Sequence, residues 1–292
     1  MSSATSFGDR IRESLETFGP LCLGIDPHRH LLDEWAVEAS ADGAREFGLR
    51  AVEAASGRIG IVKPQISFFE RYGSAGFAAL EDVLAAARSA GLIVIADAKR
   101  GDIGTTMEAY ARAWLDAGSP LEADALTVSP YLGVGALADT LRFARDRGKG
   151  VFVLAATSNP EARALQAAEL TDEGDPKDDH RRESVAERVA RDVSAENAAE
   201  VRAGRLGSIG LVVGATVDRA DLRLADASLR GAPLLAPGFG AQGARPADLG
   251  RLFGDLTPAV IASESRSLLA AGPDRLPAAI DSRAEEYRST NG

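Results

Sequence analysis

The chain has 292 residues, a formal net charge of −10 and 45% hydrophobic residues, enough for a full core in one large α/β domain or two smaller ones. The negative charge disfavours nucleic acid and anionic membrane as general partners, because both are themselves negatively charged. Any phosphate ligand must therefore be held by locally placed groups.

The N-terminal residues lack the basic region and apolar core of a signal peptide, and no apolar run approaches membrane-spanning length. The single cysteine, Cys22, lies in an apolar run and cannot form a disulfide framework. We therefore expect a soluble, cytoplasmic protein in which Cys22 is a reduced core residue.

Short apolar strands alternate with helical patterns along the whole chain. A first helix over residues 7–18 ends at Gly19-Pro20. The strands expected after it are residues 21–26, 59–69, the start of 92–106, 125–131, 150–159, 210–216, 233–240 and 259–265. The helices expected between them cover about 39–55, 74–90, 106–117, 135–147 and 184–203, and helical residues follow the eighth strand. In the second strand, Pro64 follows Lys63, so regular pairing should stop near that lysine.

Eight strands alternating with helices in a chain of this length are typical of a (β/α)8 TIM barrel. We expect a single domain, residues 1–292, with an excursion at 160–204 inserted after the fifth strand. The excursion combines a polar surface segment with a helix. A doubly wound parallel sheet is the alternative, and it would also bind ligands at the carboxyl ends of its strands.

The stretch LIVIADAKRGDIGTT, residues 92–106, organises the chemistry. Residues two apart on a strand share a face, so Asp97 and Lys99 should project together, with Asp102 on the loop beyond. Such charges at the rim of a buried sheet are costly unless they serve each other or a ligand. The chain has four lysines against 29 arginines, and lysine gives up a proton far more readily than arginine. The pattern favours a functional site over a solvated charge cluster.

Polar residues recur at the expected carboxyl ends of the strands, where TIM barrels carry their chemistry. These residues are Asp26, Lys63, Asp97, Lys99, Asp102, Ser129, Thr157, Ser158, Asn159, Thr216 and Arg266, together with the loop PGFGAQG, 237–243. The bare backbone of this loop can approach an anion, Arg266 can donate two hydrogen bonds to a phosphate, and Gln242 could fold over the ligand.

Two other motifs are given ordinary interpretations. The loop 238–243 matches G-x-G-x-x-G, but it follows the penultimate strand, which leaves no room for a dinucleotide-binding sheet. His28 and His30 have a spacing that suggests a metal, but no carboxylate or cysteine cluster completes such a site. We expect two exposed loop histidines and no metal.

The motif DAKRGDIGTT, with Lys63 and Asp26 on earlier strands, PGFGAQG, and Ser-Arg-Ser at 265–267, resembles orotidine 5′-phosphate decarboxylase. The likeness spans nearly the whole barrel, and VKPQISFFE and TVSPYLG resemble the longer bacterial subgroup, type 2. The resemblance implies the last step of UMP synthesis, in which orotidine 5′-phosphate loses CO2 from C6 without a metal or organic cofactor.

The resemblance also implies catalytic roles. Lys99 would protonate C6, and Asp97 would hold Lys99 close to the departing carboxylate. Lys63 and Asp102 would complete a preorganised network of alternating charges. The resemblance further implies a homodimer, in which each subunit contributes residues to its neighbour's site; these are Asp102, Ile103 and Thr106.

The substrate-binding residues follow in the same way. Asp26 would bind the ribose hydroxyls, and Ser129, followed by Pro130, would bind the pyrimidine. The phosphate would be held by Gln242, Gly243 and Arg266. The family commonly has glycine before this arginine, whereas Glu264-Ser265 precede Arg266 here, so the carboxylate of Glu264 should point away from the phosphate.

Three alternatives stay open. A sister barrel enzyme would use Mg²⁺ and the same Asp-x-Lys-x-x-Asp pattern, as a sugar-acid-phosphate decarboxylase or a hexulose-phosphate synthase, although Lys63 would repel the cation. A Schiff-base aldolase would need Lys99 to lose its proton near neutral pH, which the neighbouring carboxylates disfavour. A silent nucleotide-binding protein would bind UMP without turnover.

Overall fold

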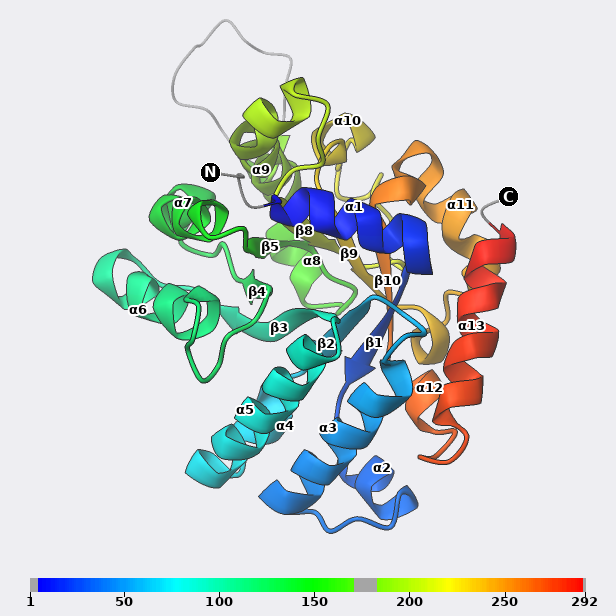
Figure 1. The fold of residues 1–292 in the computed structure, drawn as a ribbon. Coiled ribbons are helices and arrows are strands. Elements are labelled where there is room, and N and C mark those ends of the chain that lie inside the picture. Colours follow the sequence, from blue (N-terminus) through cyan, green and yellow to red (C-terminus); the bar gives the residue numbers. More distant parts are fainter. Residues whose placement is uncertain (1–4, 171–182, 291–292) are drawn as a thin grey trace, which may run out of the picture.

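The computed structural model describes residues 5–170 and 183–290, and in it eight parallel strands close into a barrel surrounded by helices (Figure 1). The barrel strands are β1 (Leu21–Ile25), β2 (Ile61–Pro64), β3 (Ile93–Arg100), β4 (Ala125–Val128), β5 (Gly150–Ala156), β8 (Ile209–Val213), β9 (Leu234–Pro237) and β10 (Val260–Glu264). The last strand, β10, pairs with both β9 and β1, which closes the sheet. The predicted TIM barrel is confirmed, and the open doubly wound sheet is excluded.

The long helices pack around the barrel; all but the last connect successive barrel strands, and the last follows β10 (Figure 1). They are α3 (Ala41–Ala55), α5 (Gly73–Ser89), α6 (Gly104–Leu115), α7 (Ala138–Asp146), α9 (Val185–Arg202) and α13 (Leu276–Thr290). Short helices fill the loops: α2 (Arg29–Glu34), α4 (Ser67–Glu70), α8 (Ala162–Gln166), α10 (Asp226–Leu229), α11 (Leu249–Phe253) and α12 (Arg266–Leu269). Single 3₁₀ turns form η1 (Val134–Leu137), η2 (Gly240–Gln242) and η3 (Pro246–Asp248), and η4 (Gly254–Ala259) is longer.

The first helix, α1 (Phe7–Phe18), lies across one end of the barrel (Figure 1). Its Phe7 and Ile11 are fully buried among inward-facing strand residues, and the rings of Phe7 and Phe152 meet edge to face at 6.0 Å. Cys22 is buried in the same cluster, and burial raises the pKa of its thiol to about 12. With this end filled, ligands enter at the other end, where the strands finish.

Several predicted strands were too long. Regular pairing of β2 stops at Pro64, as the proline indicated, but Ser67–Glu70 form helix α4 instead of continuing a strand to residue 69. The backbone N–H of Ile66 donates to the Asp97 carbonyl, and that of Phe69 then donates to the Ile66 carbonyl, so the chain turns into a helix at once. Proline cannot donate to a sheet ladder, which favours this early end.

The region after β5 begins with α8 and a two-stranded antiparallel sheet, β6 (Glu169–Leu170) with β7 (Glu183–Ser184), which the sequence did not indicate. The helix expected at 184–203 is present as α9, and the side chain of Ser184 accepts a hydrogen bond from the backbone N–H of Glu187 at its start. The predicted polar segment falls largely on 171–182, outside the described residues. In the part of the chain that is described, no helix has the length and apolar character needed to cross a membrane.

Candidate active site

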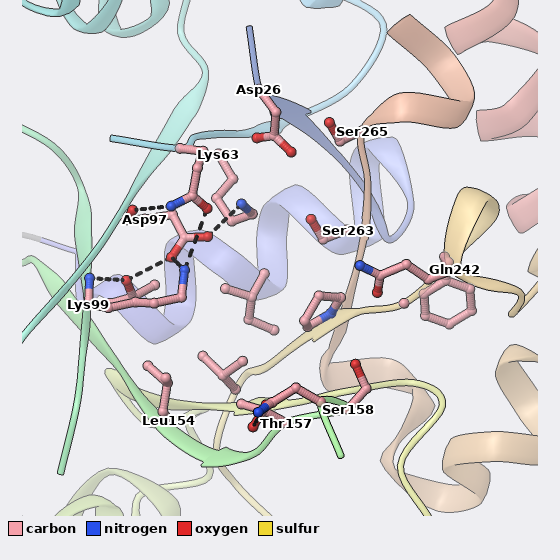
Figure 2. Close-up of a pocket in the computed structure, with 18 of the residues that line it drawn as sticks. Asp26, Lys63, Asp97, Lys99, Leu154, Thr157, Ser158, Gln242, Ser263 and Ser265 are labelled. Carbon is pink, nitrogen blue, oxygen red and sulfur yellow. Dashed lines mark hydrogen bonds and ion pairs between the residues drawn. The ribbon is translucent and has the colours of Figure 1, made fainter. Parts of the chain in front are cut away.

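A pocket of about 280 Å³ opens at the carboxyl ends of the barrel strands (Figure 2). Six of the predicted site residues line it, from β1 to the start of α12; they are Asp26, Lys63, Asp97, Lys99, Gln242 and Arg266. These residues are far apart in the sequence and meet because parallel strands bring their ends to the same rim.

The carboxylate of Asp97 lies between two ammonium groups (Figure 2). Nζ of Lys63 is 2.7 Å from Oδ2, and Nζ of Lys99 is 2.5 Å from Oδ1. The Lys63 and Asp97 side chains are 8% and 10% exposed, whereas Lys99 is 46% exposed and reaches into the pocket. Of the three, Lys99 is therefore the group best placed to meet a ligand.

Lys63 and Asp97 form a buried ion pair, and each keeps the other in its charged form. Burial by itself would raise the pKa of Asp97, but Lys63 and Lys99 outweigh it and hold that pKa well below the usual range. Burial would likewise lower the pKa of Lys63, but Asp97 and Asp26 outweigh it, so the pKa lies above its ordinary value. Both groups are thus charged at neutral pH.

The backbone is irregular where Lys99 leaves the strand. Lys99 has a φ of +49°, a left-handed conformation that costs a non-glycine residue energy, and the β3–β4 register shifts between Ala96 and Arg100. Oγ1 of Thr127, on β4, accepts from the N–H of Lys99 at 2.9 Å and donates to Oδ1 of Asp97 at 3.0 Å. Nε2 of Gln65 donates to the Asp97 carbonyl at 3.2 Å. These bonds hold the strained turn and aim Lys99 at Asp97.

Asp26 and Ser265 offer unused polar atoms to the pocket. Oδ1 of Asp26 and Oγ of Ser265 are each buried without a hydrogen-bond partner in the described part of the chain, and both residues line the cavity. Buried polar atoms are normally hydrogen bonded, so an orphaned pair at a cavity wall points to a ligand with hydroxyl or similar donors.

The carboxylate of Glu264 turns away from the pocket, as expected. Its side chain is fully buried and accepts from the Tyr287 hydroxyl at 2.8 Å and from Oγ of Ser267 at 2.7 Å. It also forms an ion pair with Arg283. Burial, and then the nearby carboxylate, raises the pKa of Tyr287 above its ordinary value. Glu264 is thus a buried anion held by the C-terminal helix.

Asp102, Ile103 and Thr106 lie outside the pocket of their own chain. Asp102 is on the loop before α6, and its Oδ1 accepts from the N–H of Ile103 at 2.8 Å. Ile103 is 60% exposed, and the neighbouring loop after β4 exposes Tyr131 and Leu132 at 77% and 53%. The loops after β3 and β4 therefore expose these apolar side chains on the surface of the protein.

Ser129, Pro130 and Gly243 also do not line the pocket. β4 ends at Val128, and the Ser129 N–H donates to the Arg100 carbonyl at 2.8 Å. The polar wall is formed by the loop after β5 instead, residues 157–159. Their position at a strand end was the available signal, but nothing in the sequence ranked them above Ser129.

Gln166 on α8 fixes this wall. Its Oε1 accepts from the backbone N–H of Thr157 at 3.0 Å, and its Nε2 donates to Oγ1 of Thr157 at 2.9 Å. Figure 2 shows Thr157 and Ser158 at the edge of the pocket opposite Asp26. The segment after β5 thereby supports the site.

The two histidines lie on or next to helix α2 and not on an open loop. His28 precedes the first helical turn, is half-buried and packs its ring on Phe68 at 4.3 Å, whereas His30 is exposed. Among the described residues no group of three histidine, cysteine or carboxylate side chains is placed to hold a metal ion.

Comparisons with known proteins agree on one family. Residues 19–276 match the family model described as "Orotidine 5'-phosphate decarboxylase / HUMPS family". The chain is 50% identical over 269 residues to the orotidine 5′-phosphate decarboxylase of Salinispora tropica, covering 92% of this chain and 91% of the relative. It is 48% identical over 285 residues to that of Streptomyces coelicolor, covering 97% of both chains.

Solved structures give the same result. A crystal structure from Streptomyces avermitilis, described as an orotidine 5′-phosphate decarboxylase, superposes with a TM-score of 0.90 at 46% identity and covers 99% of this chain and 96% of its own. The orotidine monophosphate decarboxylase of Leishmania donovani superposes with a TM-score of 0.72 at 31% identity, covering 98% of both chains.

Proposed function

This chain belongs to the orotidine 5′-phosphate decarboxylase family and converts orotidine 5′-phosphate to UMP in pyrimidine synthesis; from that premise we propose that Lys99 protonates C6 and that no metal takes part. The observation that carries this proposal is the Lys63–Asp97–Lys99 cluster at the wall of the pocket. The cluster supplies Lys99 as a partly exposed acid. The Asp97 carboxylate holds Lys99 and does not readily take up a proton, because its own pKa is lowered.

The chemistry balances with Lys99 as the acid. When the bond between C6 and the carboxylate breaks, its electron pair stays on C6 and CO2 departs. The Lys99 ammonium stabilises the developing carbanion and transfers one proton to it. The neutral amine then takes a proton from water, so the net reaction consumes one proton for each CO2 released.

Asp97 and Lys63 serve to place and to charge Lys99. The Asp97 carboxylate keeps the ammonium fixed on the pocket side, next to the substrate carboxylate that leaves. Lys63 occupies the other oxygen of Asp97, so the carboxylate is held from both sides before substrate arrives. Charges fixed in advance need not reorganise during the reaction, and this lowers the barrier.

The same arrangement favours the metal-free reaction over the Mg²⁺-dependent alternatives. Both oxygens of Asp97 already face ammonium groups, and a divalent cation at this carboxylate would lie against two positive charges. Mg²⁺ prefers carboxylate oxygens that are free to coordinate it.

We assign the rest of the substrate to the remaining walls. Asp26 accepts from the ribose hydroxyls, which the unpartnered state of its Oδ1 supports. Gln242 and Arg266, which line the cavity, bind the phosphate. Thr157 and Ser158 face the pocket and are placed for the pyrimidine's polar edge. The roles predicted for Ser129, Pro130 and Gly243 stay predictions, because none of these residues lines the cavity.

We also propose that the protein acts as a homodimer with shared sites. Asp102, Ile103 and Thr106 lie outside their own pocket, and the exposed apolar side chains of Ile103, Tyr131 and Leu132 form a surface that a second copy could cover. Asp102 would then complete the charged network in the partner's site.

The direct test follows the absorbance of orotidine 5′-phosphate with purified protein in EDTA, beside Lys99→Ala. We expect EDTA to leave wild-type turnover unchanged. Turnover by Lys99→Ala should be lower by several orders of magnitude, while this variant still binds UMP. Activity that disappears in EDTA and returns with Mg²⁺ would refute the metal-free proposal. A variant with near wild-type turnover would remove Lys99 from its role.

A further inference from the structure

Glu264 is a buried anion at an unexpected place. It ends β10 only two residues before Arg266, the residue assigned to the substrate phosphate, yet its side chain has no exposed surface. A second negative charge beside a phosphate subsite should weaken phosphate binding unless it is neutralised. The surroundings of Glu264 provide that neutralisation.

Three donors surround this carboxylate. Arg283 and Tyr287 come from the C-terminal helix α13, and Ser267 comes from α12, the short helix that begins with Arg266. Two neutral hydroxyls and one guanidinium thus satisfy the carboxylate, and Arg283 supplies the single positive charge. Removing one member of a buried ion pair is far more damaging than removing both, because the remaining charge has no partner.

The η2 turn, Gly240–Gln242, packs directly on the Glu264 carboxylate. A Cβ atom on Gly240 would lie 2.2 Å from Oγ of Ser267 and 2.6 Å from Oε2 of Glu264, so the η2 turn is seated against the carboxylate and its hydroxyl donor. Gly240 has a φ of +70°, which glycine adopts without strain. One carboxylate therefore contacts α12, α13 and the turn that carries Gln242.

We propose that Glu264, neutralised by Arg283, is a positioning residue that holds the Gly240–Gln242 turn and Arg266 in place for the phosphate. The C-terminal helix thereby becomes part of the phosphate site without touching substrate. The inference rests on the proposed assignment of Arg266 to the phosphate.

The test compares the affinities of UMP and uridine, measured by calorimetry. Their ratio reports the phosphate subsite alone, and a general loss of stability would not change it selectively. The first variant is Arg283→Met, which leaves the Glu264 carboxylate without its positively charged partner. The second is the double variant Glu264→Gln/Arg283→Met, which removes both charges and keeps similar side-chain volumes. Arg288→Met is the matched control, since Arg288 lies on the same helix but pairs with Glu285 at the surface.

We expect Arg283→Met to weaken UMP binding about tenfold or more while uridine affinity stays within about twofold. The double variant should recover to within about threefold of wild type, because no buried charge is left without its partner. Glu286, which also pairs with Arg283, has a solvent-exposed side chain. Arg288→Met should match wild type. The KM for orotidine 5′-phosphate should follow the UMP affinity, with kcat changing less.

Ser267→Ala keeps the proposal testable if Arg283→Met does not fold, because it removes only a neutral donor. We expect it to weaken UMP binding about threefold and to leave uridine binding unchanged. An unchanged ratio in both Arg283→Met and Ser267→Ala, or in Ser267→Ala when the first variant is unfolded, would overturn the proposal. If Arg266→Gln leaves the ratio of UMP to uridine affinity unchanged, Arg266 does not bind the phosphate and the proposal is wrong. That result would not affect the assignment of the decarboxylation.

Discussion

Thr127, a residue that is 1% exposed, donates a hydrogen bond from Oγ1 to Oδ1 of Asp97 across 3.0 Å. The same oxygen accepts from the N–H of Lys99, the residue whose backbone is left-handed. One hydroxyl on β4 thus links the anion of the buried pair to the main chain of the proposed acid. It fixes the separation between the two groups that must act together.

Replacing Thr127 with valine should therefore lower kcat. Valine has the same shape but neither donates nor accepts, so we expect a fall of about 10- to 100-fold in kcat with little change in KM. Thr127→Ser keeps the hydroxyl and should recover most of the rate. Steady-state kinetics of both variants decides the matter, and wild-type kcat in Thr127→Val would show that the hydroxyl is dispensable.

Shared sites predict complementation between two inactive variants. Lys99→Ala and Asp102→Asn should each lose turnover as homodimers, but a hybrid dimer keeps one site with both residues intact. After mixing under conditions that allow subunit exchange, activity should rise to about a quarter of wild type, since half of the dimers are hybrids with one working site of two. Mixtures that stay inactive although hybrids form would place Asp102 in its own chain's site.

The Lys63–Asp97 pair predicts how stability responds to pH. The pKa of Asp97 is lowered on folding, so its contribution is present above its unfolded value of about 3.9 and is lost as pH falls through the lower folded value. The pKa of Lys63 is raised, so its contribution is present below about 10.4 and is lost as pH rises through the higher folded value.

The measurement is urea unfolding of wild type and of Lys63→Met/Asp97→Asn from pH 3 to pH 9. The difference in unfolding free energy between the two proteins should be flat from about pH 5 to 9 and should shift in favour of the variant below about pH 4. A difference that is constant down to pH 3 would mean that folding does not lower the pKa of Asp97.

Gly240 offers a matched comparison with Gly57, which has a similar φ of +72° but open space where a Cβ would lie. Alanine at either position should lower stability by about 1 kcal/mol through the left-handed backbone alone. Only Gly240→Ala should also weaken UMP binding, by about tenfold, because its Cβ displaces Ser267 and Glu264. Calorimetry on both variants tests this, and equal UMP affinities would contradict it.

The barrel could be predicted because its signal is repeated: eight apolar runs, each followed by a polar residue and a helix. The proximity of Asp97 and Lys99 could also be predicted, from the alternation of side chains along a regular strand. In fact β3 is irregular there, and Lys99 adopts a left-handed backbone supported by Thr127. A local pattern does not reveal a bond to a strand that lies about 30 residues further along.

Which loop reaches the pocket was harder to predict. β4 and β5 end at Val128 and Ala156, so Ser129 and Thr157 are each the first residue after a strand, yet only Thr157 lines the pocket. Position relative to a strand end therefore does not distinguish the two loops. For Glu264 the sequence indicated only that the carboxylate points away. Its partners Arg283 and Tyr287 lie 19 and 23 residues later, and only the docking of α13 brings them to it.

The pairing of β1 with β10 has a consequence for synthesis on the ribosome. The first strand carries Asp26 at its end, but its open edge has no neighbour until the last barrel strand has emerged. The negative charge of Glu264 is then compensated only after Arg283 has also been synthesised. If Glu264 has the proposed positioning role, a nascent chain that lacks α13 would hold the Lys63–Asp97–Lys99 cluster and still bind nucleotide poorly until the C-terminal helix docks.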